Sequence, residues 1–122
     1  MALAQAANES SWGRSRFAIE GHNYFGQWCF KSACGFVPKH RPSEAKHEVR
    51  RFSSTRQSVA AYLFNINSHE AYKNLRQLRA DLRSSKQPLS GIALAQGLGK
   101  YSERGDEYIT ELREMIRVNG LE

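Results

Sequence analysis

Small and apolar residues recur at helical spacing at the start of the chain, and this spacing is lost over residues 21 to 52. Residues 2 to 11 predict a first helix with Leu3, Ala6 and Ala7 on one face. The segment that follows contains glycines, prolines and a cluster of aromatic side chains, which favours irregular structure. Within it, GFVPK and HEVRRF predict two short strands around a turn at RPSEAK.

Helical spacing resumes after residue 52. The stretch SSTRQSVAAYLFNINS predicts a helix, in which Ser54 and Gln57 have the spacing of a capping box. Its apolar stripe is expected to be Val59, Tyr62, Leu63 and Ile66. The next stretch, HEAYKNLRQLRADLRS, predicts a second helix that Asn67 or Ser68 caps. Its expected stripe is Tyr72, Leu75, Leu78 or Arg79, and Leu82.

Two further helices are predicted after the break at QPLSG. The first, SGIALAQGLGKY, is short and apolar. The second, RGDEYITELREMIRVNG, turns one face inward and ends at Gly120, and the inward residues are Ile109, Leu112, Met115 and Ile116. The pattern therefore predicts a mainly α chain of the α+β class, with a small β-hairpin lobe beside a helical body and a substrate cleft between them.

The composition indicates one folded domain with excess positive charge. The chain has 122 residues, with 18 Lys and Arg against 12 Asp and Glu. This balance favours an anionic partner or serves solubility alone. We expect no nucleic-acid partner, because no binding motif accompanies the scattered basic residues, and no membrane span, because no apolar run is long enough. Met1 leads straight into a helix, so we expect residues 1–122 to be a whole short chain or the C-terminal part of a longer one.

Two cysteines, Cys29 and Cys34, lie in WCFKSACG. Their spacing does not fit a zinc site or a redox pair, so they are either reduced thiols or a disulfide. A bridge across so short a loop would contribute about 2 kcal/mol at most. We favour the bridge, and with it an oxidising compartment.

Glu9 lies where the Ala-rich run AQAANESSWG should stop being helical, and Gly13 can adopt the left-handed conformation that closes a helix. Taken alone, Glu9 is either a solvated glutamate at a helix end or a carboxyl group held protonated for chemistry.

Four stretches carry a resemblance to a known family: AQAANESSWGRSRFA, NYFGQWCF, VRRFSSTRQSVAAYLFNIN and YSERGDEYITELREMI. Together they resemble the bacterial Bax-type branch of the glucosaminidase family (glycoside hydrolase family 73), in the family's order and over nearly the whole chain. The resemblance implies a lysozyme-like helical domain that cleaves β-1,4 bonds of peptidoglycan after N-acetylglucosamine. It also implies a periplasmic or cell-envelope location. The reaction that it implies needs no cofactor or metal.

The resemblance assigns Glu9 as the general acid. A free glutamate titrates near 4.3, so this role requires its pKa to rise by about two, which is roughly 2.7 kcal/mol. A helix C-terminus supplies about 0.3 to 1 kcal/mol. Desolvation must supply the rest, and Trp12, Tyr24 and Phe25 are the candidate neighbours.

A second catalytic carboxylate is expected on the β lobe in some members of that family. Glu44 and Glu48 are the candidates, and each is otherwise a solvated charge of the hairpin. A late tyrosine also approaches the acid in such proteins, which points to Tyr101 ahead of Tyr108. Tyr108 is then a residue of the binding site or of the core.

Aromatic side chains stack on sugar rings, and the candidate substrate-binding residues are Trp12, Tyr24, Phe25 and Trp28. Asn23 either binds an N-acetyl group or stabilises the turn. The alternative to a hydrolase is a non-catalytic module with the same fold that binds or organises glycan strands.

Overall fold

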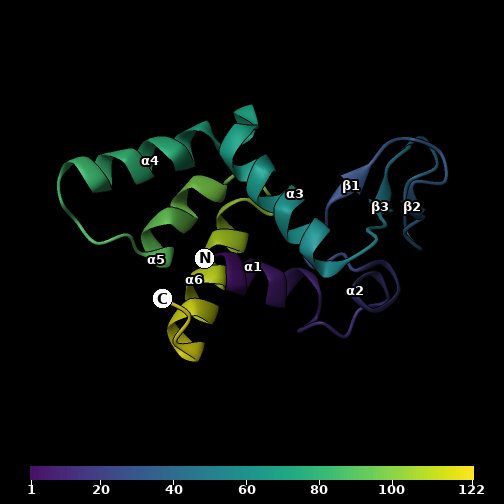
Figure 1. The fold of residues 1–122 in the computed structure, drawn as a ribbon, viewed down its shortest axis with the longest axis horizontal. Coiled ribbons are helices and arrows are strands. Elements are labelled where there is room, and N and C mark those ends of the chain that lie inside the picture. Colours follow the sequence, from purple (N-terminus) through teal and green to yellow (C-terminus); the bar gives the residue numbers. More distant parts are fainter. The chain divides into compact units, whose positions relative to one another are not determined.

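The computed structural model describes residues 1–122 and is mainly helical, with one small antiparallel sheet (Figure 1). The predicted α+β class is therefore confirmed. The chain divides into two compact units. We call residues Ala6–Tyr62 the sheet unit, and Met1–Gln5 together with Leu63–Glu122 the helical unit. None of the helices is both long and apolar enough to cross a membrane.

The first helix, α1, spans Ala2–Glu9. Its fully buried positions are Ala4 and Gln5, whereas Leu3 is 68% exposed, so the predicted inward position of Leu3 is wrong. The buried face is set by a polar contact that the periodicity could not reveal. Gln5 donates a hydrogen bond from its side-chain amide to the Tyr108 hydroxyl at 3.0 Å.

The sheet consists of β1 (Trp28–Cys29), β2 (Gly35–Phe36) and β3 (Glu48–Arg50), with β3 in the middle. The antiparallel pairing of β2 with β3 confirms the predicted hairpin. A Cβ atom on Gly35 would lie 2.0 Å from the Val49 carbonyl oxygen, so this crossing requires glycine. The two-residue β1 was not predicted, because it is too short to show any alternation.

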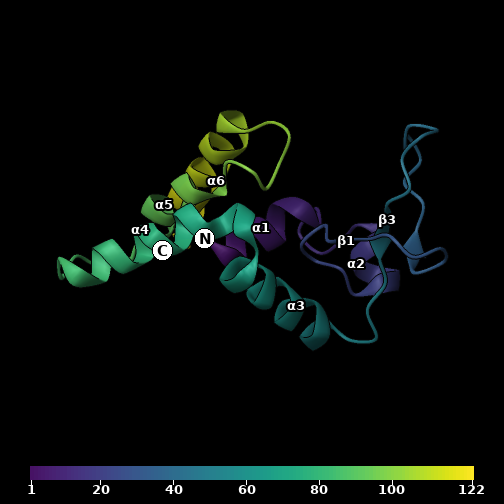
Figure 2. The same cartoon turned by 90° about the horizontal axis from the view of Figure 1, so that it is seen from above.

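A second short helix, α2 (Arg16–Gly21), also escaped prediction. The Ser15 side chain caps it by accepting a hydrogen bond from the Ala18 amide. In two views α2 lies beside the sheet (Figures 1 and 2). The contact is close because Gly21 has no side chain: a Cβ there would lie 2.4 Å from the Phe36 ring.

Helix α3 spans Thr55–Ser68, and Ser54 caps it as predicted by accepting a hydrogen bond from the Gln57 amide at 3.2 Å. Its buried residues are Ser58, Tyr62 and Ile66, spaced four apart. Val59 and Leu63, which were expected to face inward, are 38% and 49% exposed. The buried stripe is displaced by one residue at the start of the helix because Ser58 takes an inward position and donates to a backbone carbonyl.

A 3₁₀ turn, η1 (Glu70–Tyr72), precedes helix α4 (Lys73–Ser84). The expected caps are wrong, because Asn67 and Ser68 still belong to α3. His69 caps η1 instead, and its ring nitrogen accepts a hydrogen bond from the Ala71 amide at 3.0 Å. Tyr72 and Leu75 are buried as predicted.

The short apolar segment forms α5 (Gly91–Leu94) and η2 (Ala95–Leu98), and the last helix, α6, spans Asp106–Asn119. Gly97 lets η2 approach α4 closely, since a Cβ on Gly97 would lie 2.4 Å from the Leu75 Cα. The predicted core residues Ile109, Leu112 and Ile116 are buried.

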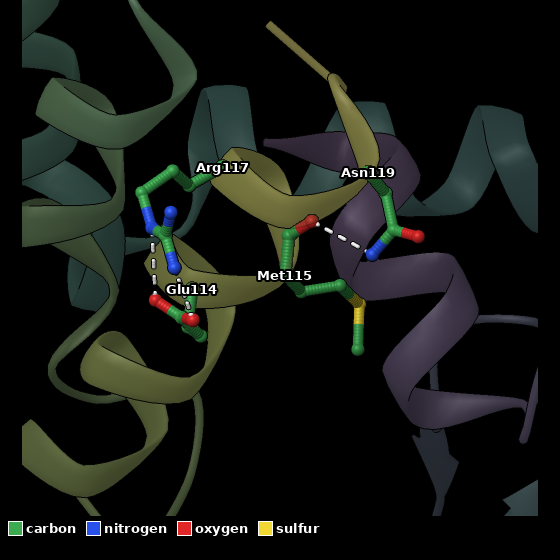
Figure 3. Close-up of polar contacts among 4 residues, drawn as sticks. All are labelled: Glu114, Met115, Arg117 and Asn119. Carbon is green, nitrogen blue, oxygen red and sulfur yellow. Dashed lines mark hydrogen bonds and ion pairs between the residues drawn. The ribbon is translucent and has the colours of Figure 1, made fainter.

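Helix α6 ends as predicted, with Gly120 in the left-handed conformation at φ 61°. The exposed side of its last turns carries the Glu114–Arg117 ion pair (Figure 3). The hydrogen bond with Arg117 lowers the pKa of the Glu114 carboxyl. Asn119 donates from its side chain to the Met115 carbonyl at 3.0 Å.

Candidate active site

Glu9 is the last residue of α1, and the backbone becomes left-handed two residues after it. Ser11, Trp12 and Gly13 all have positive φ, at 51°, 58° and 80°. The Trp12 amide closes the helix by donating to the Ala7 carbonyl at 2.8 Å. The left-handed closure therefore begins at Ser11, two residues before the predicted glycine. Two non-glycine residues in this conformation store about 1 to 3 kcal/mol each, which is typical of functional sites.

Ser10 holds this reversal in place. Its side chain is 1% exposed; the hydroxyl donates to the Ala6 carbonyl at 2.6 Å and accepts from the Gly13 amide at 2.8 Å. The Ser10 carbonyl accepts a further bond from the Ser15 amide at 3.0 Å. One serine thus joins the end of α1 to the loop that leads into α2.

The Glu9 carboxyl group lies against the backbone of Gly26. A Cβ on Gly26 would lie 3.0 Å from Glu9 Oε2, and Gly26 has a φ of 67°. Glu9 itself is half-buried. Two of the segments that carry the family resemblance contain ESSWG and NYFG, and these therefore meet at the carboxyl group of Glu9, where Gly26 supplies the close approach.

Asn23 has the turn-stabilising role. It is 1% exposed, and its side-chain nitrogen donates to the Gln27 and Arg50 carbonyls, both at 2.9 Å. Its side-chain oxygen accepts from the Phe25 and Gln27 amides, both at 3.2 Å. The amide has no capacity left for an N-acetyl group, and it fixes the loop that carries Gly26.

The candidate aromatic residues separate into buried and open ones. Phe25 is 4% exposed and stacks on Tyr62, with ring centres 4.0 Å apart, so its ring belongs to the core. Tyr24 is half-buried with its ring against Gly13, 3.6 Å from where a Cβ would stand. Trp12 is 54% exposed. Tyr24 therefore lies against the left-handed turn that contains Trp12, whereas Phe25 is part of the core.

Trp28 is the open aromatic of the sheet. It is 52% exposed, and its indole stacks on the His47 ring with centres 3.7 Å apart and planes 11° from parallel. Phe30 meets it edge-on. The Trp28 indole is therefore a partly exposed aromatic surface beside the His47 ring.

The two candidate carboxylates of the sheet unit differ in their surroundings. Glu48 is 7% exposed, and its carboxylate accepts hydrogen bonds from the Ala33 amide at 3.1 Å and the Gly35 amide at 2.9 Å. Glu44 is exposed and contacts Ser43. Glu48 therefore organises the loop before β2, and this role accounts for both of its oxygens.

Cys29 and Cys34 form a disulfide, with their Cα atoms 6.3 Å apart. The bridge closes the loop whose backbone amides bind Glu48. Ala33, next to the bridge, has a φ of 64°. The disulfide and the buried carboxylate together fix a loop of little apolar content.

The late tyrosines belong to the helical unit, whereas Glu9 belongs to the sheet unit. Tyr108 is 1% exposed and accepts the hydrogen bond from Gln5, so it has the core position. Tyr101 is half-buried and lies parallel to Tyr108, with ring centres 5.8 Å apart and planes 3° from parallel.

Sequence reasoning missed three residues that shape this region: Ser10, Gly26 and His47. Only the glycine left a usable signal, because a glycine directly after two aromatic residues indicates a special backbone position. Ser10 and His47 act through partners that no local pattern identifies.

The comparisons with known proteins support a glycan-hydrolase-like fold for this helix, turn and small sheet. The family model of glucosaminidase (mannosyl-glycoprotein endo-beta-N-acetylglucosaminidase) matches residues 1–121, so the chain belongs to the glucosaminidase family. It is 37% identical over 119 residues to "Protein bax" of Escherichia coli (strain K12). That match covers 98% of this chain and 42% of the relative. No solved structure matches.

Proposed function

We propose that this domain is a peptidoglycan hydrolase of the endo-β-N-acetylglucosaminidase type, with Glu9 as its general acid. The observation that carries the proposal is the Glu9 carboxyl group, which lies against the backbone of Gly26 at the end of a helix that a strained left-handed turn follows. Strain of this kind persists only where the surroundings enforce it, and it is concentrated at functional sites.

In the proposed reaction, protonated Glu9 donates its proton to the oxygen of the β-1,4 bond while that bond breaks. A water oxygen then bonds to the anomeric carbon and loses a proton, which restores the acid. Glu9 is half-buried at the C-terminal end of α1, and the proposed role requires its carboxyl group to carry a proton near neutral pH. Trp12, Tyr24 and Trp28 are the aromatic residues available to hold the sugars.

The test compares the wild-type chain with Glu9→Gln on purified cell walls. Loss of turbidity and release of reducing ends are measured together. We expect the variant to lose about 100-fold or more in rate, since general acid catalysis contributes about 10²–10⁴-fold. Glu103→Gln removes the same charge at an exposed site and should keep wild-type activity. Equal rates for Glu9→Gln and wild type would remove Glu9 from this role.

A second candidate function is a non-catalytic module that binds glycan strands. The observation that favours it is the buried Glu48 carboxylate, whose oxygens accept hydrogen bonds from backbone amides. Under this alternative the wild-type chain binds wall sacculi and releases no reducing ends. Glu44→Gln tests the second candidate carboxylate: retention of activity would remove Glu44 from the reaction.

The proposed substrate lies outside the cytoplasm, and we propose a periplasmic or cell-envelope location. The Cys29–Cys34 disulfide supports this, because such bonds persist in oxidising compartments. Thiol titration of protein isolated from the envelope should find no free thiol.

A further inference from the structure

The positive charge of the chain is concentrated in the sheet unit. Residues 6–62 include nine Lys and Arg against four Asp and Glu, whereas the helical unit has nine against eight. One of the four acids, Glu48, is buried and bound to backbone amides. The sheet unit, which contains Glu9, therefore carries most of the chain's net positive charge and should attract anions.

Within this unit, two arginines converge on one aromatic ring. The guanidinium carbon of Arg51 lies 4.1 Å from the centre of the Phe36 ring. That of Arg16 lies 5.3 Å from the same centre and 5.1 Å from the centre of the Phe17 ring. Phe17 meets Phe36 edge-on with centres 5.6 Å apart, and Gly21 backs the ring. The platform is thus built from α2, β2 and the residue after β3.

The donors of these two guanidinium groups are largely unused. The Arg16 side chain makes no hydrogen bond or ion pair within the chain. Arg51 donates one hydrogen bond, to the Glu20 carbonyl at 3.2 Å. The Glu20 carboxylate forms an ion pair with neither Arg16 nor Arg51.

A guanidinium group that stacks on a ring keeps its N–H edge open. That edge matches the two oxygens of a carboxylate, and stacking orders the group before it binds. Because the guanidinium groups lie over Phe36, this ring is not available to stack a nucleic-acid base.

We propose that Arg16 and Arg51, ordered by Phe36, bind the carboxylate groups of the peptides attached to peptidoglycan strands. The inference deepens the proposed function, since it adds to the glycan at Glu9 a recognition site for the peptide. The chemistry required of the ligand is a planar, exposed carboxylate on a flexible chain.

Binding to insoluble sacculi tests the inference without hydrolysis, in chains that all carry Glu9→Gln. We call Arg16 and Arg51 the arginine patch, and the patch variant adds Arg16→Gln and Arg51→Gln. The control adds Arg56→Gln and Arg83→Gln, which remove the same charge at exposed sites without side-chain partners. We expect the patch variant to bind about tenfold more weakly than the control, as two exposed charge-assisted contacts allow. A variant with Arg16→Lys and Arg51→Lys keeps the positive charge but loses the paired N–H donors of the guanidinium groups. Its affinity for sacculi should lie between those of the patch variant and the control.

Three further arms identify the ligand. On sacculi whose peptides an amidase has removed, patch and control variants should bind equally. Walls tested before and after removal of phosphodiester polymers should show the same patch effect. A duplex DNA oligonucleotide should not bind more tightly than sacculi.

The inference is overturned if patch and control variants weaken equally, if the patch effect survives removal of the peptides, if it follows the phosphodiesters, or if DNA binds better. Circular dichroism confirms that each variant is folded. Release of reducing ends by the chain without Glu9→Gln is measured separately, so a failure of hydrolysis leaves the binding result intact.

Discussion

At the scale of single residues, Ser10 decides how the chain leaves α1. Its buried hydroxyl satisfies both the Gly13 amide and the Ala6 carbonyl. In Ser10→Ala the Gly13 amide loses its partner inside the protein, so we expect the free energy of unfolding to fall by about 1–3 kcal/mol. Urea denaturation measures the loss.

The matched control is Ser84→Ala. Ser84 also donates to the carbonyl four residues earlier, at 3.0 Å, but it is exposed and supports no other amide. We expect a change of less than about 0.5 kcal/mol there. Equal losses in the two variants would show that Ser10 has no special part in the turn.

Gly26 sets the distance between the backbone and Glu9. Gly26→Ala should push the carboxyl group, because the new Cβ would stand 3.0 Å from Oε2. It also places a side chain at a φ of 67°, which costs about 1–2 kcal/mol. We expect hydrolysis of cell walls to fall at least tenfold at temperatures where the variant is folded, since small misplacements of a catalytic group cost up to about 100-fold.

Gly120→Ala separates these two effects. Gly120 has a similar φ of 61°, and nothing lies within 4 Å of its added Cβ. It should lose comparable stability and keep its activity. If Gly26→Ala loses stability and keeps full activity, the contact between Gly26 and the carboxyl group of Glu9 has no catalytic importance.

At the scale of elements, Glu48 makes the sheet depend on a buried carboxylate. Its oxygens accept hydrogen bonds from Ala33 and Gly35 across the loop that the disulfide closes. In Glu48→Gln the side-chain NH₂ would face one of these backbone N–H groups. Both groups are donors, so one of the two hydrogen bonds would be lost. We expect a loss of about 1–3 kcal/mol in thermal or urea unfolding. Any loss of activity should follow the loss of folded protein.

Glu44→Gln is the comparison within the same segment. Glu44 is exposed and bonds only to Ser43, so its substitution should leave the unfolding free energy within about 0.5 kcal/mol of wild type. A Glu48→Gln chain that is as stable as wild type but inactive would contradict the structural role and indicate a catalytic role for Glu48.

Elements with several helical turns could be predicted from the sequence, because each turn repeats the burial signal. Thus α4 and α6 occur where expected, with Leu75 and Leu112 buried. In contrast, β1 and α2 contain two and six residues and repeat no signal. Local pattern also failed at His69 and Ser58, where one polar contact moved a cap or a face.

The site shows the same division. The family motif located Glu9, and the structure adds Gly26 beside its carboxyl group. The roles of Asn23 and Glu48 could not be derived from the sequence, since Asn23 binds the Arg50 carbonyl and Glu48 binds amides 13 and 15 residues away. A polar residue whose partners are distant has the same local pattern whether it is buried or solvated.

At the scale of the whole molecule, the two units differ in what stabilises them. The helical unit is built from packed helices around Leu75, Leu98 and Leu112, each at most 1% exposed. The sheet unit has short strands and relies on a disulfide, a buried carboxylate and a fully bonded asparagine. Polar contacts of this kind hold a loop in one conformation, which the proposed glycan site requires.

The stability of the molecule should also depend on alkaline pH through Tyr72. Burial raises the pKa of its hydroxyl above the ordinary 10.0, and a hydrogen bond with Asn65 partly offsets this. Because the native pKa exceeds the unfolded one, this contribution is complete below the unfolded pKa and is lost as pH rises through the native pKa. The free energy of unfolding should therefore fall above about pH 10 in the wild type and less steeply in Tyr72→Phe, which cannot ionise. Urea unfolding across this range, with tyrosinate absorbance as a second signal, measures both slopes; equal slopes would show that Tyr72 ionises alike in the folded and unfolded chain.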